Sequence, residues 1–586
     1  MTQPNNEQLE KIRHSLSHIM TAAIMERWPK VKLGVGPAIE NGFYQDYGLP
    51  EKISDEDLPS IEKRMKEIIR QKLAFEQELM AKKDALNFYR DDPFKTELVN
   101  EFYPDESEQV QFYKIGGSRQ LCRGGHLDNT GDIDSDSFKL VSVAGAYWRG
   151  DENNQMLTRI YGLAFATKDE LEKHLALLKE AKERDHRKFG KELDLFTFSE
   201  LVGAGLPLWT PKGTIIRTEL DNFIWQLRQQ YGYQKVTVPH LTKKELYEKS
   251  GHWKNYQDDL FKVSSREEHQ YAIKPMNCPH HTQIFARKIQ SYRDMPQRYA
   301  ETTMVYRDEQ SGELNGLSRV LCITQDDAHV FCRKNQIADE VGKIWNIVNS
   351  FYGAFNLPLC IRLSLHDPKH PENYLGDEDN WQMAENELRK VIQSRQSTCT
   401  EAPGEAAFYG PKIDFMATDS LQRVWQVATI QLDFNMPERF DLSCISENGQ
   451  HERIVMLHAA ITGSLERFIS VMLEHCNGNL PLWCSPVQIK LLTINDKQFE
   501  PAKKLLTDWQ AQGIRAELDE TNDTLGNKIR RAVSEKIPYV IVLGDKEIQS
   551  QSLSVRVRGQ DTASTVKQQE FVTQLQEKIK QRSLEL

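Results

Sequence analysis

The charged stretch from Ala166 to Leu193 divides this chain, and so limits what the chain can fold into. Its sequence, ATKDELEKHLALLKEAKERDHRKFGKEL, repeats apolar residues at helical spacing with charged residues between them. This pattern predicts a solvated connecting helix over residues 166–193. With 586 residues and 39% hydrophobic content, the chain can fill the cores of about three or four domains. We therefore expect domains at residues 1–165, 194–482 and 483–586.

The three regions that flank the connector differ in their patterns. Residues 1–165 mix helical segments with strand-like runs such as FKLVSVAGAYW and RIYGLAFA, which indicates an α+β domain. Residues 194–482 alternate strand-like segments (YQKVTVPHL, ETTMVYRDE, RVWQVATIQLDF) with helices. Residues 483–586 run strand, helix, strand, helix, strand (VQIKLLTI, PAKKLLTDWQAQ, IRAEL, NKIRRAVSEK, YVIVLG). That order predicts a small α/β domain with a parallel sheet.

Composition excludes several classes of protein. No run of about 18 apolar residues could span a bilayer, and the first residues, MTQPNNEQLEKIRHSLSH, are polar. We therefore expect a cytoplasmic protein that does not bind membranes. The nine cysteines include no C-x-x-C pair, which argues against a disulfide framework and against zinc ribbons. The net charge of −10 does not favour nucleic acid, although one face of the protein can still be basic.

A single thiol lies beside two imidazoles in the segment KPMNCPHH, where Cys278 precedes His280 and His281. Pro279 is a typical first helical residue, so neighbouring side chains there point about 100° apart around a helix. Cys278 and both histidines therefore cannot face one ion. Two interpretations remain open: Cys278 is a small buried hydrophobe, or it is a metal ligand whose partners lie elsewhere in the chain.

Arginines in two segments suggest an anion site. In YRDEQSGELNGLSR, Arg307 and Glu309 end a strand-like run, a glycine-containing turn follows, and Arg319 is expected on the returning strand. Two guanidinium forks placed this way can hold a polyphosphate, although they can equally be exposed surface cations. In ITGSLERF, a helix follows Gly463 and Ser464 and carries Arg467 near its N-terminus, where anions are favoured. The chain contains no G-x-x-x-x-G-K-[ST] loop, so a nucleotide would have to be held by arginines.

The order of these motifs resembles the class II aminoacyl-tRNA synthetases, and within them the threonyl-tRNA synthetases, over essentially the whole chain. The segments that carry the resemblance are GYQKVTVP, KPMNCP, YRDEQSGELNGLSR with TQDDAHVF, FYGPKIDF, WQVATIQLDF and HAAITGSLERF. The resemblance implies an antiparallel sheet with flanking helices, between an N-terminal α+β editing domain and a C-terminal α/β anticodon-binding domain. It also implies a homodimer, with Pro239 at the end of the motif that forms the dimer interface.

The resemblance further implies that L-threonine is activated with ATP and Mg²⁺ and transferred to tRNA(Thr). Arg307 would contact the α-phosphate and the substrate carboxylate, Glu309 the adenine, and Arg467 the γ-phosphate end. The other residues implied for this part of the cleft are Arg319, Lys412, Gln426, Thr429 and Ser464. Of all these, Arg307, Arg467 and Lys412 would be the catalytic residues.

A catalytic zinc ion, Zn²⁺, is also implied, with one cysteine and two histidines as ligands. The matching positions are Cys278, His329 in TQDDAH and His458 in VMLHAA. Three protein ligands leave an open coordination position, which is typical of zinc that meets a substrate. Threonine would bind zinc through its amino and hydroxyl groups, and Asp327 would accept from the hydroxyl. The residues implied around the threonine are Met276, Gln325, Tyr409 and Gln431.

Two further sites belong to the flanking domains. His14 and His18 in HSLSH, and Cys122 and His126 in CRGGH, each lie four residues apart, a spacing that suits a zinc site and also a packed quartet. The resemblance instead implies that these four residues and Lys95 form an editing site that hydrolyses seryl-tRNA(Thr), with no obligatory metal. For the C-terminal domain, the candidate tRNA anticodon contacts are Lys528, Arg530, Arg531, Arg556 and Arg558, although a solvated charged face is nearly as good an interpretation.

Some residues depart from the family pattern. Gln120 occupies an often acidic position in the editing site, and Gln549 does so at the anticodon end. His280, Leu321, Cys322 and Ala459 replace residues that are common near the active site. A ubiquitin-like domain that often precedes the editing domain is expected to be absent, because only 13 residues precede His14.

Two rival interpretations remain. A prolyl or alanyl type of class II enzyme would share the ATP site but would lack the Cys278, His329 and His458 set. A non-catalytic tRNA-binding relative would be expected to lose Arg307 or Arg467, and both are present.

Overall fold

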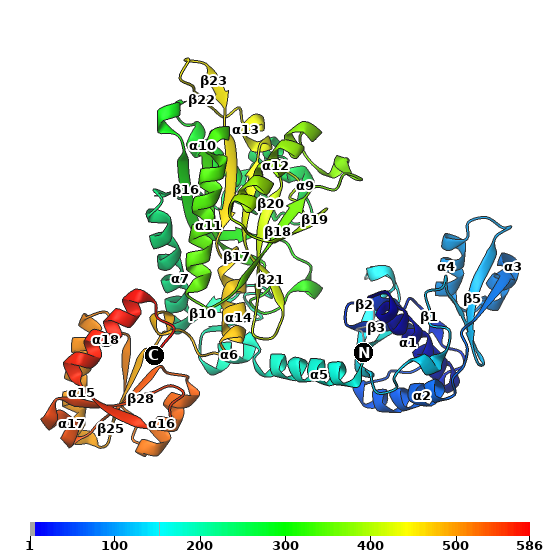
Figure 1. Ribbon diagram of the computed structural model, residues 1–586, viewed down its shortest axis with the longest axis horizontal. Coiled ribbons are helices and arrows are strands. Elements are labelled where there is room, and N and C mark those ends of the chain that lie inside the picture. Colours follow the sequence, from blue (N-terminus) through cyan, green and yellow to red (C-terminus); the bar gives the residue numbers. More distant parts are fainter. Residues whose placement is uncertain (1–5, 152) are drawn as a thin grey trace. The chain divides into compact units, whose positions relative to one another are not determined.

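The structure is a computed structural model that describes residues 6–151 and 153–586. The chain forms two compact units, Met1–Glu180 and Ala181–Leu586, which are coloured from blue to cyan and from cyan to red in Figure 1. Each unit has its own hydrophobic core. Among the described residues, no helix is long and apolar enough to cross a membrane.

The first unit contains an antiparallel sheet covered by two helices. Its strands are β1 (Lys32–Leu33), β2 (Ala38–Ile39), β3 (Gly42–Gly48), β7 (Phe138–Tyr147) and β8 (Met156–Ala164). They pair in the order β1-β3-β8-β7, and β2 also pairs with β3. Helices α1 (Asn6–Arg27) and α2 (Leu58–Arg70) contact this sheet, and their apolar residues form one core with it. The α+β fold expected for this region is confirmed.

A smaller lobe completes the first unit. Strands β4 (Glu76–Ala81), β5 (Gln109–Ile115) and β6 (Ser118–Leu121) form an antiparallel sheet. Helices α3 (Lys82–Phe88) and α4 (Pro93–Phe102) pack on it around a separate core. Asp92 caps α4, because its carboxylate accepts from the backbone N–H groups of Phe94 and Lys95.

The connector is two helices and not the single helix that the sequence pattern predicts. Helix α5 spans Lys168–Glu183 and α6 spans His186–Glu192. Asp185 stops the first helix and caps the second, since its side chain accepts from the N–H of Arg187. A capping aspartate competes with helix continuation, and the repeat of apolar positions alone does not reveal this.

The second unit is built around an eight-stranded sheet. Its strands run in the order β11-β16-β17-β24-β21-β20-β18-β19. Their bounds are β11 (Gln234–Lys235), β16 (Gln297–Tyr306), β17 (Cys322–Cys332), β24 (Val455–Ala460), β21 (Val424–Asp433), β20 (Lys412–Thr418), β18 (Leu359–Leu365) and β19 (Cys399–Pro403). The six central strands pair antiparallel, as expected, while β11 and β19 join the edges in parallel.

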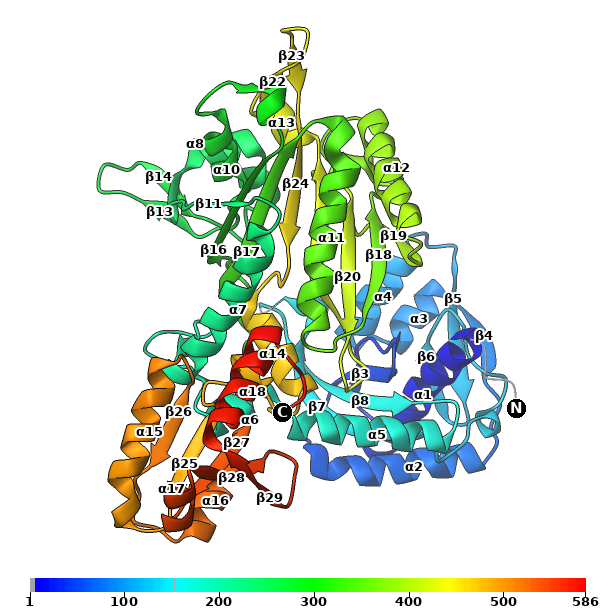
Figure 2. The same cartoon turned by 60° about the vertical axis from the view of Figure 1, so that its left-hand side comes forward.

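Helices close one face of this sheet. Figure 2 shows α11 (Ile337–Gly353) and α12 (Glu378–Ser394) lying along it. With α7 (Pro211–Gln229) and α14 (Leu465–His475), they bury a large apolar core whose members recur at helical spacing, as in Ile344, Ile347, Val348 and Phe351. This packing leaves the other face of the strands to polar side chains.

Shorter elements complete the central region. The helices are α8 (Lys244–Ser250), α9 (His252–Asn255), α10 (Cys278–Ala286) and α13 (Asn435–Arg439). The strands are β9 (Phe196–Thr197), β10 (Leu208–Trp209), β12 (Leu241–Lys243), β13 (Lys262–Ser264), β14 (Gln270–Ile273), β15 (Gln290–Ser291), β22 (Ser443–Ile445) and β23 (His451–Arg453). In the segment YQKVTVPHL, strand is limited to Gln234–Lys235 of β11 and to Leu241, the first residue of β12. Between them, the N–H of Val238 donates to the Glu301 carboxylate and not to a neighbouring strand.

The last hundred residues fold as an α/β domain (Figure 1). Strands β25 (Ile489–Thr493), β26 (Ala516–Asp519) and β27 (Tyr539–Leu543) are parallel, with α15 (Phe499–Ala511) and α16 (Leu525–Ser534) between them, as predicted. Two strands that the sequence pattern does not predict, β28 (Ser552–Val557) and β29 (Ala563–Lys567), extend the sheet antiparallel. Two more helices, α17 (Asp545–Ser550) and α18 (Gln568–Gln581), complete the domain.

Candidate functional site

The register of the central sheet brings distant residues into rows. His329 on β17 lies opposite His458 on β24, which lies opposite Gln431 on β21, which lies opposite Lys412 on β20. A second row lies two residues further along the strands and contains Asp327 on β17, Thr429 on β21 and Asp414 on β20. Side chains two apart share one face of a sheet. The rows therefore collect predicted site residues on the face opposite the helices.

Cys278, His329 and His458 converge at one end of these rows. One potential ligand atom from each residue lies within 4.8 Å of the others, and all three side chains are buried. His329 Nε2 is 3.1 Å from His458 Nδ1. Cys278 is the first residue of α10, immediately before Pro279, and its thiol lies beside the two imidazoles. The sheet supplies the two imidazoles, and the helix supplies the thiol.

A second ring of side chains fixes the orientation of this trio. Asp433 accepts from His458 Nε2 at 2.9 Å, so the hydrogen of that imidazole is on Nε2 and its Nδ1 keeps a lone pair. His281 Nδ1 lies 2.8 Å from His329 Nδ1, and His252 Nε2 lies 3.7 Å from Cys278 Sγ. These partners hold the ligand atoms toward one another.

Burial sets the ionisation of this cluster in the absence of an ion. It raises the pKa of the Cys278 thiol well above its usual range, and the Asp327 and Asp433 carboxylates raise it further. It lowers the pKa of His329 well below the usual range. Burial also lowers the pKa of His252 to about 3. The imidazoles of His329 and His252 are therefore neutral, which is the form that binds metals.

The arginine loop, residues 307–321, joins β16 to β17 at the other end of the rows. Arg307 follows β16 directly, and its buried Nε has no hydrogen-bond partner. Glu309 accepts from Arg319 Nε and Nη2, at 2.8 and 2.5 Å. Arg319 lies in a turn bridged to Asn315 and not on the returning strand as expected, because β17 begins only at Cys322. The loop thus presents Arg307 without a partner of its own at that nitrogen.

Helix α14 approaches the same loop from the neighbouring side. Ser464 caps its N-terminus by accepting from the N–H of Arg467. Arg467 Nε donates to Ser318 O at 2.9 Å. Burial lowers the pKa of Arg467, and the charges of Arg307 and Arg319 lower it further. Arg319 is paired with Glu309 and Glu313, so Arg307 and Arg467 are the guanidinium groups that make this corner electropositive at the helix N-terminus.

Asp414 organises the floor between these two ends. Lys412 Nζ lies 3.0 Å from Asp414 Oδ2, and the other oxygen accepts from Gln426 Nε2 at 2.8 Å and Thr429 Oγ1 at 2.9 Å. Arg362 Nη2 and Ser364 Oγ also donate to this fully buried carboxylate. Asp414 holds the predicted residues Lys412, Gln426 and Thr429 in place, although no sequence pattern marked Asp414 itself.

The residues expected around the amino acid lie beside the Cys–His–His trio. Asn277 Nδ2 donates to Asp327 Oδ2 at 3.0 Å, which leaves Oδ1 directed toward His329 Nε2, 3.6 Å away. Tyr409 OH donates to Gln431 Oε1 at 2.7 Å. Gln325 Oε1 is buried and has no partner. This end of the cleft therefore offers acceptors and unsatisfied polar atoms to a small polar ligand.

A single cavity of about 400 Å³ joins both ends. It is lined by every residue predicted for ATP, threonine and zinc except Arg319, which contacts the lining residue Glu309 instead. Ile323, Glu405 and Thr462 also line it. Among the residues that depart from the family pattern, Ala459 lines the cavity, and Leu321 accepts from the N–H of Arg307. His280 Nε2 instead lies 2.5 Å from Thr242 Oγ1.

The first unit has a cavity of its own, of about 240 Å³. His14, His18, Lys95, Gln120 and Cys122 line it. Cys122 Sγ lies 3.5 Å from His14 Nε2 and 3.1 Å from His126 Nε2, and the His18 and His126 ring centres are 4.4 Å apart.

Burial shifts the pKa values of Lys95, which lines this cavity, and of His126, which contacts the lining residue Cys122, toward the neutral forms. It lowers the pKa of Lys95 to about 8 and that of His126 to about 3. Gln120 donates to His18 O and Ser118 Oγ, so its amide braces the floor of the cavity. The five residues predicted for this region therefore lie together.

The predicted cations of the C-terminal domain are dispersed. Lys528 is buried, with Nζ 3.5 Å from Asp519 O, while Arg530 is exposed. Arg531 pairs with Asp519 at 2.7 Å. Arg558 donates to the backbone oxygens of Lys536 and Leu480, so it braces the chain. Arg556 lies half-buried on β28.

Comparisons with known proteins match this architecture region by region. The model of the "tRNA synthetase class II core domain (G, H, P, S and T)" matches residues 261–476. The "Anticodon binding domain" matches residues 486–578, and the "Threonyl and Alanyl tRNA synthetase second additional domain" matches residues 110–161.

Two relatives similar to this chain are named threonine–tRNA ligase. A threonine–tRNA ligase of Deinococcus deserti is 46% identical over 93% of this chain and 85% of its own length. One from Thermotoga neapolitana is 44% identical over 100% of this chain and 90% of its own length. A crystal structure described as the RNA-binding domain of threonyl-tRNA synthetase from Cryptosporidium parvum Iowa II has a TM-score of 0.65 and 34% identity, over 67% of this chain and 98% of that one.

High identity to these relatives extends through the catalytic sheet and both flanking regions. The fold, the domain matches and the identities agree, and they bear out the resemblance on which the sequence analysis relied. The chain belongs to the threonine–tRNA ligase family of class II aminoacyl-tRNA synthetases.

Proposed function

We propose that this chain activates L-threonine with ATP, transfers the threonyl group to tRNA(Thr), and hydrolyses seryl-tRNA(Thr) made in error. One observation carries the proposal: the Cys278, His329 and His458 ligand atoms converge in the same cavity as Arg307 and Arg467. A thiol and two imidazoles suit zinc, whereas the arginines suit a polyphosphate. A cleft that combines the two fits an enzyme that joins a small polar amino acid to a nucleotide.

In activation, the carboxylate of threonine attacks the α-phosphorus of ATP, and the bond to pyrophosphate breaks. Arg307 has an unpartnered buried Nε at the arginine loop, so we assign it to the α-phosphate and the attacking carboxylate. Arg467 would hold the γ-phosphate end, and Mg²⁺ would accompany ATP. Fixed positive groups of this kind stabilise the charge that develops during phosphoryl chemistry.

The rest of the nucleotide would lie over the floor that Asp414 organises. Glu309 would contact the adenine, and Arg319, which holds Glu309, would support that contact. We assign Gln426, Thr429 and Ser464 to the nucleotide and Lys412 to the region between the two substrates. Because Asp414 already fixes several of these side chains, little of their conformational freedom would be lost on binding.

The donor set at the other end fits zinc. It has one thiol and two imidazoles, each imidazole is fixed by a second polar partner, and Nδ1 of His458 keeps its lone pair toward the cluster. Bound there, zinc would supply an open coordination position for the amino and hydroxyl groups of threonine. Asp327 would accept from that hydroxyl, with Met276, Gln325, Tyr409 and Gln431 enclosing the ligand.

Editing follows from the limits of such a site. Serine has the amino and hydroxyl groups of threonine and lacks only a methyl, which is worth roughly 10- to 200-fold in discrimination. We assign the hydrolysis of seryl-tRNA to the cavity in the first unit. The lining residues His14, His18 and Cys122, with His126 in contact with Cys122, would position the terminal ribose and a water molecule, and Lys95 lies beside them. The neutral imidazoles favoured by burial suit this task better than fixed charges do.

We also propose a cytoplasmic homodimer whose C-terminal domain contacts the anticodon. The exposed Arg530 and half-buried Arg556 support contacts to tRNA, while the partnered Lys528 and Arg558 would act mainly by holding the domain in shape. Support for a second copy comes from Leu201, which is 99% exposed, and from exposed Val202 and Leu208 in the same segment. Sedimentation of the chain as a monomer at micromolar concentration would contradict the dimer.

The decisive experiment is ATP–pyrophosphate exchange with a panel of amino acids, before and after zinc is removed by a chelator. We expect exchange with threonine, weak exchange with serine and negligible exchange with valine, and we expect chelation to abolish all of it until zinc is restored. An enzyme that prefers another amino acid, or that keeps full threonine-dependent exchange without zinc, would refute the proposal.

A further inference from the structure

His186, the first residue of α6, contacts the arginine loop at its backbone. The N–H of Leu317 donates to His186 Nε2 at 3.0 Å. Because a backbone N–H can only donate, Nε2 carries a lone pair and the ring hydrogen is on Nδ1. Nδ1 lies 2.6 Å from Glu474 Oε1, which also accepts from the His186 backbone N–H at 3.0 Å. One imidazole therefore links the loop to helix α14.

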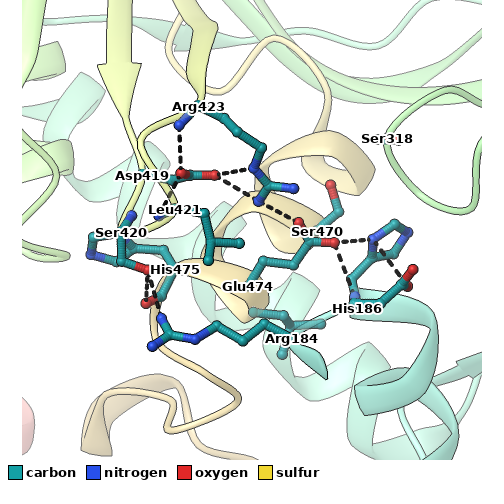
Figure 3. A network of polar contacts seen from close by, with 12 residues as sticks. Arg184, His186, Ser318, Asp419, Ser420, Leu421, Arg423, Ser470, Glu474 and His475 are labelled. Atoms are coloured by element: carbon teal, nitrogen blue, oxygen red, sulfur yellow. Dashed lines mark hydrogen bonds and ion pairs between the residues drawn. The ribbon is translucent and has the colours of Figure 1, made fainter. Parts of the chain in front are cut away.

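The carboxylate at the centre of this contact is held from both sides. Figure 3 shows Glu474 between His186 and Arg423, with Asp419 on the other side of Arg423. Arg423 Nη2 donates to Glu474 Oε2 at 2.5 Å and lies 2.6 Å from Asp419 Oδ2. Burial raises the pKa of Glu474, but the hydrogen bonds from His186 and Arg423 outweigh it and lower the pKa below its usual value. Glu474 is thus a fixed anion that orients the imidazole.

Helix α14 holds the arginine loop at two points, once directly and once through His186. Arg467, two helical turns before Glu474, donates to Ser318 O, and Glu474 acts through His186 on the adjacent Leu317. Gly316 completes the contact: its φ is +51°, and a Cβ at this position would overlap His186 Nε2. Two consecutive residues are thus held at their backbone, Leu317 through its N–H and Ser318 through its carbonyl oxygen. Leu317 and Ser318 are the two residues that precede Arg319, and Arg319 donates to Glu309.

We propose that His186 is a positioning residue for ATP, which fixes the arginine loop through Leu317 while Glu474 fixes His186. The proposal rests on the proposed function, because it gives the arginine loop the task of binding ATP. His186 itself does not line the cavity, so it acts only through the loop. His186 begins the second helix of the connector, so the connector itself carries a residue that shapes the ATP site.

The test compares two substitutions at His186 with a matched control. His186→Leu keeps the bulk and removes both ring nitrogens, whereas His186→Gln retains an acceptor for the N–H of Leu317. His475→Leu serves as the control. His475 follows Glu474 on α14, but its Nδ1 accepts from the N–H of Ser420, which lies outside the arginine loop. Circular dichroism and the melting temperature establish that each variant is folded.

The measurement is ATP–pyrophosphate exchange with separate KM values for ATP and threonine. We expect His186→Leu to raise KM for ATP and lower kcat, with a combined loss of about 10- to 100-fold for a loop displaced by a fraction of an ångström to an ångström. KM for threonine should stay unchanged, His186→Gln should recover most of the loss, and His475→Leu should behave as the wild type does.

Three outcomes would overturn the proposal: wild-type kinetics in folded His186→Leu, equal rises in KM for both substrates, or no recovery in His186→Gln. Gly316→Ala provides an independent approach from the loop side and should reproduce the rise in KM for ATP. A wild-type enzyme that lacks threonine-dependent exchange would instead refute the proposed function, so the two failures are distinguishable.

Discussion

His329 and His458 face each other across adjacent antiparallel strands, with Nε2 of the first 3.1 Å from Nδ1 of the second. This register, and not their place in the sequence, makes them neighbours. Cys278 reaches the same point from a helix that begins with it. The geometry of the trio therefore depends on the sheet, and changes in any member should affect metal and activity together.

Cys278→Ala should lose bound zinc and threonine activation together, because the thiolate is one of only three protein ligands. Atomic absorption and pyrophosphate exchange measure the two losses. Cys444→Ala is the matched control, since Cys444 is a buried thiol of the same apolar cluster and lies outside the cavity lining. Full activation by a zinc-free Cys278→Ala protein would count against the assignment of the site.

His281→Leu should weaken zinc binding while leaving the three ligands in the chain. His281 Nδ1 lies 2.8 Å from His329 Nδ1, and partners of this kind change metal affinity by about 10- to 100-fold. Competition with a chromophoric chelator measures the affinity directly. An unchanged zinc affinity would show that His281 does not orient His329.

Asp327→Ala should reduce the selectivity for threonine over valine. A site that hydrogen-bonds a substrate hydroxyl rejects the analogue without it by roughly 10⁴-fold or more, because its buried polar groups are left without partners. Removing the acceptor removes part of that penalty, so the ratio of kcat/KM values in the exchange assay should fall by tenfold or more. A ratio equal to that of the wild type would exclude Asp327 from hydroxyl recognition.

His18→Ala should abolish hydrolysis of preformed seryl-tRNA(Thr) and leave threonine-dependent exchange within about twofold of the wild type. His18 lines the cavity of the first unit and not that of the catalytic sheet, so synthesis and editing should separate. Gln120→Glu tests the departure from the usual acidic residue and should retain hydrolysis. If the wild type leaves seryl-tRNA intact, the first unit does not edit.

Lys95→Met should stabilise the protein near neutral pH. Burial lowers the pKa of Lys95 from 10.5 to about 8, so between these values the unfolded chain binds more protons and stability rises with pH. Below pH 8 the full cost of burying the charge is present, about 3 kcal/mol.

Urea unfolding of the full chain from pH 7 to 10 should therefore show a more stable variant at pH 7, with the gain shrinking as pH rises. Lys83→Met, at an exposed position of the same lobe, should change little. An identical pH dependence in the wild type and Lys95→Met would refute the assignment of this titration to Lys95.

Local patterns were sufficient for much of the architecture. The parallel strands β25, β26 and β27 follow from short apolar runs separated by amphipathic helices, and the long strands of the catalytic sheet follow from alternating runs. Strand β28 was missed although its sequence, SLSVRV, alternates polar and apolar residues, because it is only six residues long, whereas β29, ASTVK, has only two apolar residues. The break at Asp185 was missed because a cap interrupts a helix without changing its apolar period.

The arginines pointed to an anion site by themselves, but the Cys–His–His trio was predictable only through the resemblance. No local spacing links Cys278 to His329 and His458, since only the sheet register places them together. Asp414, Asp433 and His252 were not singled out, and His281 was considered only as a ligand, because a buried residue that orients another carries no pattern of its own in a single sequence. Such partners become visible only from contacts in the folded chain.

The short helix α6 determines where this chain can be divided. A cut after Glu180, where the two units part, leaves Asp185 to cap α6 and His186 to hold Leu317 in the remaining fragment. A cut after Leu193, where the charged stretch ends in the sequence, removes both. An isolated synthetic unit cut after Glu180 should therefore keep its affinity for ATP. One cut after Leu193 should lose affinity, although all cavity-lining residues remain in it.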